Sequence, residues 1–162
     1  AYLDVLTGLG NRRAFEQQIE AINQSEAPSE GLYCVTCDIN NLKWANDTLG
    51  HSQGDTLIAD AAALLQAAFG AQGQTFRTGG DEFVAFVRQP PEAMQQALYS
   101  LQAAISDYNG CHEVALSLAV GAARYVPDGP SSLLQVLTES DQRMYVDKKA
   151  QKAQGLTKDI SE

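Results

Sequence analysis

The sequence predicts a single α+β domain in which a mainly antiparallel central sheet is covered by helices. Short apolar runs of strand length alternate with longer stretches of helical spacing, a tight glycine turn joins two strands, and no internal repeat is present. The predicted order is helix, strand, helices, two strands joined by a hairpin, helix, strand, helix. Its centre, β-α-β-β-α-β, indicates a ferredoxin-like or split βαβ core.

The first helix and the first strand lie on either side of a polar loop. Apolar residues at helical spacing predict an amphipathic helix over 11–23, and Pro28 lies in the loop 25–31. Residues 32–39 form a β-rich apolar run without alternation, which is typical of a central strand buried on both faces. Asp38 is therefore expected at the carboxyl end of a central strand.

Two helices are predicted after this strand. Asn40 and Asn41 are natural N-caps for a short helix that extends to residue 44. A longer helix is predicted over 55–69, because its apolar residues form one stripe at helical spacing. Both helices are expected to pack on the sheet.

A hairpin is predicted next, with strands over 75–78 and 83–87. Gly79, Gly80 and Asp81 connect them and are expected to supply the positive φ angles of a tight turn. The hairpin therefore carries carboxylates at its tip.

The C-terminal part is predicted to contain a helix, a strand and a second helix. Two consecutive prolines end the preceding strand and begin a helix that reaches about residue 108. A strand over 114–125 with a bend at Gly121 follows, then a turn over 127–130 and a long helix over 131–153.

Composition and charge limit the classes of ligand. The chain has 162 residues, with 11 Lys and Arg against 20 Asp and Glu, giving a net charge of −9. This excess disfavours nonspecific binding to nucleic acid or an anionic membrane. No apolar run approaches the ~20 residues of a membrane span, and three cysteines suit a reducing cytosol. We therefore expect a soluble cytoplasmic domain that contacts neither nucleic acid nor membrane directly.

Acidic residues lie at two places that a central sheet would bring together. Asp38 ends the first strand, and Asp81 and Glu82 lie at the hairpin tip, so neighbouring strands would place all three within a few ångströms. Such carboxylates repel one another unless a hard cation such as Mg²⁺ neutralises them. Taken singly, the two sites are also consistent with a solvated turn and a helix-capping acid.

Groups that favour phosphate lie near the same strand end. The short helix after Asp38 directs unpaired backbone amides toward it, and Lys43 lies nearby. Lys148 and Lys152 share one face of the last helix, although lysines on a terminal helix are more often simply solvated. Together with the carboxylates, these residues suggest metal-assisted nucleotidyl transfer.

Four segments of the chain resemble the GGDEF domains of bacterial diguanylate cyclases. The resemblance covers nearly the whole chain in the right order. The matching segments are Asp4-Val5-Leu6-Thr7-Gly8-Leu9 with Asn11-Arg12-Arg13, Asp38-Ile39-Asn40-Asn41-Leu42-Lys43 with Asn46-Asp47, Gly50-His51 and Gly54-Asp55, Gly79-Gly80-Asp81-Glu82-Phe83 preceded by Arg77, and Asp141 and Met144-Tyr145 with Lys148.

The resemblance implies a palm-type fold and a reaction that joins two GTP molecules into cyclic di-GMP and releases two pyrophosphates. Each domain of a homodimer would hold one GTP, so a lone domain is half an enzyme. Asp38, the Ile39 carbonyl and Asp81 would bind Mg²⁺ or Mn²⁺, with two ions per half-site. Glu82 would assist with the metal or deprotonate the attacking 3′-hydroxyl, so Asp81 and Glu82 are the catalytic pair.

The same resemblance assigns the substrate contacts. Asn46 and Asp55 would hydrogen-bond the guanine edge, since a carboxylate accepts from the guanine N1 and N2 hydrogens and an amide both donates and accepts. Gly79 and Gly80 form the signature turn. The residues implied around the phosphates are Asn41, Leu42, Lys43, Lys148 and Lys152.

Three departures from the family pattern stand out. Asn40 replaces a frequent second Asp, and it is interpreted as a cap. Gln151-Lys152-Ala153 replaces Gly-Arg-Asn, so Lys152 keeps a charge but loses a bidentate fork. Gly70 and Gly73 occupy the Arg and Asp positions of the family's RxxD product-inhibition site, so feedback through that site is expected to be absent.

Two other functions remain open. One is a non-catalytic domain that binds GTP and regulates a neighbouring domain; the other is a different palm-like nucleotidyl transferase or nucleotide cyclase with another base preference. We expect residues 1–162 to form one such domain, excised from a longer signalling protein. The parent protein is expected to carry an upstream sensory or dimerising domain, and its anchoring in a membrane is left open.

Overall fold

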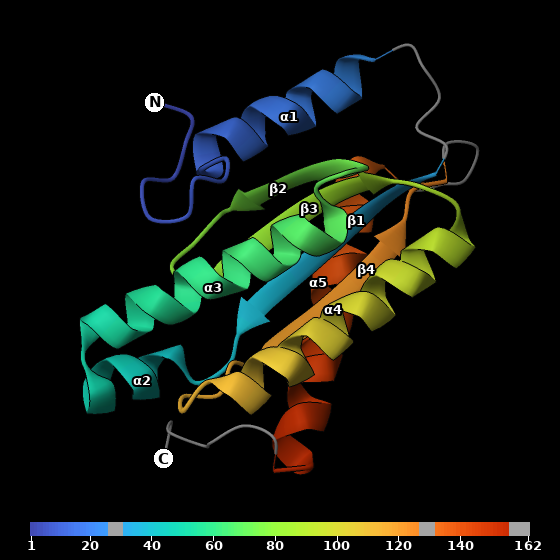
Figure 1. Cartoon of the computed structure of the whole chain (residues 1–162). Helices are drawn as coiled ribbons and strands as arrows, with labels where there is room; N and C mark the ends of the chain where they lie inside the picture. The colour runs from blue at the N-terminus through green and yellow to red at the C-terminus, as the bar shows by residue number, and fades with distance from the viewer. Residues whose placement is uncertain (26–30, 127–131, 156–162) are drawn as a thin grey trace.

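The computed structural model describes residues 1–25, 31–126 and 132–155, which form one four-stranded sheet with helices on both faces (Figure 1). The strands are β1 (Leu32–Ile39), β2 (Gly73–Arg77), β3 (Glu82–Arg88) and β4 (Leu118–Arg124). Their order is β2-β3-β1-β4, and every neighbouring pair is antiparallel. The predicted α+β class and the β-α-β-β-α-β core are confirmed.

The helices cover the sheet in two layers (Figure 1). They are α1 (Arg12–Gln24), α2 (Leu42–Leu49), α3 (His51–Phe69), α4 (Pro91–Cys111) and α5 (Leu133–Ala153). Helices α3 and α4 pack on one face of the sheet, α1 and α5 pack on the other, and α2 packs against α3. The end of β1 that carries Asp38 leads into the start of α2, and α5 packs on the face of the sheet opposite α3 and α4.

Strand β1 has a buried side chain on each face. Val35 and Cys37 belong to the core under α3 and α4, whereas Leu32 and Cys34 belong to the core under α1 and α5. The prediction of a central strand buried on both faces is therefore confirmed, and β1 is a rigid support for the residues that follow it.

The bounds of three elements differ from prediction by four residues or more. Helix α2 extends to Leu49, α3 begins at His51 rather than residue 55, and β4 begins at Leu118 rather than residue 114. Only Gly50 separates α2 from α3, and its φ of 93° accounts for the sharp turn between them. The polar first turn of α3 carries no apolar period, so hydrophobic spacing could not locate it. Residues 26–30 and 127–131, which were assigned to loops and a helix start, lie outside the described residues.

Gly121, at which a bend is predicted, has a packing role in the structure. It lies inside β4, and a Cβ built there would collide with the backbone of α5 at Ser140 and Met144. The missing side chain lets α5 approach the sheet closely enough to reach the end of β1. Among the described residues, no helix has the length and apolar character needed to cross a membrane.

Candidate active site

The pairing of β1 with β3 brings the predicted acidic residues to one end of the sheet. Asp38 lies opposite Glu82 in the antiparallel register, and the Ile39 amide donates to the Asp81 carbonyl oxygen at 2.9 Å. Side chains of directly opposed residues lie on the same face of an antiparallel pair. The approach of the two segments is therefore confirmed at the level of the backbone.

Asp38 is the largely buried carboxylate at this end of the sheet, and it interacts with charged side chains of α5 and of the hairpin. Lys148 of α5 donates to its Oδ2 at 2.8 Å, and the Asp38 side chain is only 16% exposed. Burial raises the pKa of Asp38 to about 6; the Lys148 hydrogen bond opposes this shift, and the neighbouring Asp81 carboxylate adds to it. The two aspartates are thus close enough to repel each other, and one lysine does not neutralise both.

The donor set fits a hard divalent cation. Asp38 and Asp81 supply carboxylate oxygens and Ile39 a backbone carbonyl, which are the ligand types that Mg²⁺ prefers. Asn40 adds a side-chain oxygen that is buried without a hydrogen-bond partner among the described residues. In the described ranges, no three His, Cys, Asp or Glu side chains are grouped as an ion would require, so the predicted cluster of three carboxylates is reduced to a pair. Glu82 lies over Gly79 instead.

Arg77 shapes the signature turn between β2 and β3. Its guanidinium donates to the Gly79 carbonyl at 3.2 Å and the Gly80 carbonyl at 3.0 Å, and it pairs with Asp4 at 3.2 Å. Neither glycine has a positive φ, so the predicted conformational reason for the Gly-Gly pair is wrong. The sequence predicts a role for Gly79 and Gly80 but none for Arg77. The feature of the sequence that could have indicated a role for Arg77 is its position two residues before the turn.

The start of α2 differs from the predicted cap. Asn41 is the N-cap residue, but it has a left-handed φ of 66° and its side chain makes no capping hydrogen bond. Asn40 is buried and its amide donates to Ser117 and Gln151, so the interpretation of Asn40 as a cap is wrong. Leu42 is buried and Lys43 is exposed in the first turn of the helix.

The predicted guanine contacts lie on α2 and α3. Asn46 is half-buried on α2 and Asp55 is exposed on α3. The Asn46 amide packs directly against Gly54, where any Cβ would collide with it. Gly54 therefore lets Asn46 lie beside the residue that precedes Asp55. Lys152 is exposed on the last turn of α5.

Comparison with known proteins gives a consistent result. The family model described as "Diguanylate cyclase, GGDEF domain" matches residues 1–154. The chain is similar to diguanylate cyclase DgcS of Shewanella oneidensis, with 30% identity over 76% of this chain and 42% of the relative. It is also similar to diguanylate cyclase DgcN of Escherichia coli, with 31% identity over 88% of this chain and 36% of the relative. The chain thus spans less than half the length of these two proteins.

A solved structure shows the same architecture. The GGDEF domain of DgcB from Caulobacter crescentus, determined in complex with cyclic di-GMP, superimposes with a TM-score of 0.80 at 26% identity. The match covers 93% of this chain and 91% of that domain. The FimX GGDEF domain of Pseudomonas aeruginosa, at 22% identity and a TM-score of 0.81, shares the fold.

Proposed function

Because the chain belongs to the family of diguanylate cyclase GGDEF domains, we propose that it condenses two GTP molecules into cyclic di-GMP. In each half-reaction a ribose 3′-hydroxyl attacks the α-phosphorus of the other GTP, an oxygen–phosphorus bond forms, and pyrophosphate leaves. Two half-reactions close the ring and release two pyrophosphates. The observation that carries the proposal is the register that joins Asp38 of β1 to the Asp81–Glu82 turn.

Each residue of the acidic end has a role in this proposal. Asp38, Asp81 and the Ile39 carbonyl would hold the metal, Mg²⁺ or Mn²⁺, with Glu82 assisting. When bound, the ions offset phosphate charge and acidify the attacking hydroxyl. Glu82 is half-buried beside the turn and would accept the proton of the 3′-hydroxyl.

The remaining roles concern the nucleotide. Lys148 donates to Asp38, which keeps its ammonium group at the proposed metal end, where it would contact the triphosphate once an ion binds Asp38. Asn46 and Asp55 would read the guanine edge. The amides of Asn41, Leu42 and Lys43, together with the exposed lysines Lys43 and Lys152, would surround the phosphates.

Catalysis is proposed to require a homodimer, because each domain would present one GTP to the other. Product analysis with GTP and Mg²⁺ over a range of protein concentrations tests this. The initial rate is expected to rise more steeply than linearly with protein. GTP binding without cyclic dinucleotide at any concentration would instead support a non-catalytic regulatory domain, and Lys152 in place of the family's arginine is the feature that favours this alternative.

We also propose that the chain lacks product inhibition of the RxxD type. Gly73 lies against β3, where a Cβ would collide with the Phe86 carbonyl, so the position has no room for an aspartate side chain. Added cyclic di-GMP is expected to leave the initial rate unchanged. The wider assignment, one domain over 1–162 within a longer signalling protein, is likewise a proposal. An intact-protein mass measurement of the natural gene product checks it.

A further inference from the structure

Helix α5 contacts the residues on both sides of Ile39. Lys148 bonds Asp38, as described above, and Gln151, almost one turn later, accepts from the Asn40 side chain at 2.7 Å. The Ile39 carbonyl is a proposed metal ligand and Asn40 leads into the start of α2. One face of α5 therefore bridges the metal end and the phosphate end of the candidate site.

Asn40 has no freedom of orientation in this arrangement. It is 5% exposed, its backbone amide donates to the Ser117 carbonyl at 2.8 Å, and its side-chain amide donates to the Ser117 hydroxyl at 2.9 Å and to Gln151. Both side-chain N–H groups are thus used. Asn41 follows with its left-handed φ, so the direction in which α2 starts depends on where Asn40 is held.

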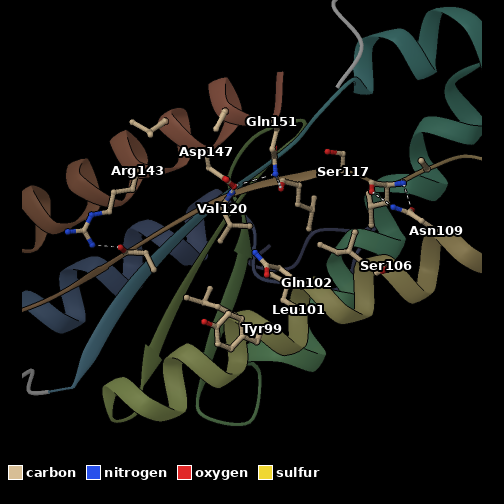
Figure 2. Close-up of a pocket in the computed structure, with 18 of the residues that line it drawn as sticks. Tyr99, Leu101, Gln102, Ser106, Asn109, Ser117, Val120, Arg143, Asp147 and Gln151 are labelled. Atoms are coloured by element: carbon tan, nitrogen blue, oxygen red, sulfur yellow. Dashed lines mark hydrogen bonds between the residues drawn. The ribbon is translucent and has the colours of Figure 1, made fainter. Parts of the chain in front are cut away.

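Gln151 is itself fixed at its other end. Its Nε2 donates to the Leu118 carbonyl of the edge strand β4 at 2.9 Å and lies 3.4 Å from the Asp147 carboxylate (Figure 2). The same Asp147 oxygen accepts from the Val120 amide at 2.9 Å. The amide orientation of Gln151 is therefore set by β4, which leaves its Oε1 as the acceptor for Asn40.

We propose that Gln151 is a positioning residue for the Mg²⁺–GTP site, acting through its hydrogen bond to Asn40. The inference rests on the proposed function, because it concerns the nucleotide that this site would bind. Asn40 and Gln151 are two of the positions at which the chain departs from the family pattern, and the structure places them in direct contact. The amide pair links the proposed phosphate-binding start of α2 to α5 and β4.

Loss of this link would weaken nucleotide binding in the folded protein, beyond any effect on stability. Without Gln151, one N–H of Asn40 loses its acceptor and the β1–α2 junction gains freedom before the nucleotide binds. A lost hydrogen bond of this kind corresponds to roughly a 10-fold change in an equilibrium constant. The affinity for Mg²⁺ with a non-hydrolysable GTP analogue is the direct readout, since it needs no turnover.

The experiment compares Gln151→Leu with Gln142→Leu in the full 162-residue chain. Gln142 lies exposed on the same helix and is the matched control. Calorimetric titration at a temperature where unfolding curves show all variants fully folded is expected to give about 10-fold weaker binding for Gln151→Leu and less than about 2-fold change for Gln142→Leu. Equal binding by wild type and Gln151→Leu would overturn the inference.

A double-mutant cycle separates positioning from general destabilisation. Asn40→Ala is expected to weaken binding at least as much as Gln151→Leu, because it also removes the buried side-chain oxygen, and Asn40→Ala with Gln151→Leu no more than Asn40→Ala alone, because Gln151 acts through Asn40. Multiplying effects would overturn the inference, and Gln151→Ala replaces Gln151→Leu if the leucine variant does not fold. The wild-type protein tests the proposed function separately. If it binds the GTP analogue but forms no product from GTP, only the proposed cyclase reaction is wrong. If it does not bind the analogue, both the proposed function and this inference are wrong.

Discussion

The two ends of the candidate site differ in how they are held. At the metal end, Asp38 is largely buried on a central strand and bonded to Lys148. At the proposed guanine end, Asp55 is exposed on α3, and Asn46 is half-buried on α2 with its amide packed against Gly54. The difference favours a proposed metal end that is organised before ligand binds and a proposed guanine end that depends on local helix geometry.

At the proposed metal end, burial of the Asp38 carboxylate has a free-energy cost for folding. The pKa of Asp38, about 6, means that the folded protein holds its carboxylate charge less readily than water does. Such a group opposes folding once it is ionised, and a bound cation would offset that opposition. Substitutions at the two ends should therefore affect different measurements.

The largest expected effect comes from Asp38→Asn. Turnover should fall by at least about 100-fold, because one charged metal ligand is lost from the proposed transition-state environment. The free energy of unfolding of metal-free protein should not fall, since the buried charge is removed. Product formation and urea unfolding measure the two effects.

Asp107→Asn is the matched control, because Asp107 is exposed on α4 and distant in sequence from every proposed ligand. Its turnover should equal that of wild type. Full turnover by Asp38→Asn would show that the acidic end is not the metal site.

At the guanine end, Asp55→Ala should act on substrate choice. A hydrogen bond to a charged acceptor corresponds to roughly 10- to 100-fold in affinity, so preference for GTP over ATP should fall by that factor. Asn46→Ala should lower the preference by a smaller factor of about 10. Competition binding with the two nucleotides measures this.

The exposed neighbour Asp47→Ala serves as control on α2 and should leave the preference unchanged. If Asp55→Ala and Asn46→Ala kept full preference for GTP, the nucleotide would be read elsewhere. The different palm-like transferase considered above would then become the better description.

A smaller effect is expected from Arg77→Met, which removes the bonds that hold the signature turn. Arg77 is 18% exposed in its side chain and contacts Asp4, Gly79 and Gly80. The free energy of unfolding should fall by about 1–3 kcal/mol. Arg124→Met, at the end of β4, removes the same charge and should change stability by less than about 0.5 kcal/mol. Similar losses in both variants would assign the effect to net charge.

The smallest expected effect is on folding stability at acidic pH, and it involves Asp4. Burial would raise the pKa of Asp4, but hydrogen bonds from Thr7 and Arg77 outweigh it and lower that pKa below the ordinary value of 3.8. Since the folded-state pKa is the lower one, this stabilisation is complete above the unfolded-state pKa and is lost as the pH falls through the folded-state pKa.

Asp4→Asn should therefore cost about 1 kcal/mol of unfolding free energy near neutral pH, and the difference from wild type should shrink below about pH 4. Urea unfolding over this range measures it. A difference that stays constant with pH would mean that the Asp4 charge contributes nothing.

Prediction from sequence succeeded where a pattern is local and repeated. The apolar run of β1 matched its observed bounds, and the stripe on α3 matched its buried face, because burial on a strand or helix imposes a period on neighbouring residues. It failed at Gly79 and Gly80, whose turn depends on Arg77, and at Asn40, whose partners are distant in the chain. Hydrophobic periodicity along the chain cannot reveal these hydrogen bonds.

The amino-acid order by itself determined the fold class, the two-faced central strand and the acidic residues at the strand end and the hairpin. Only the tertiary structure decided that Asp38 lies beside Asp81 and accepts from Lys148, and that Gln151 accepts from Asn40. The physical reason is range: hydrophobic periodicity acts between residues a few positions apart, whereas charge repulsion and hydrogen bonding in the site join residues from β1, β3 and α5 that meet only after the sheet has formed.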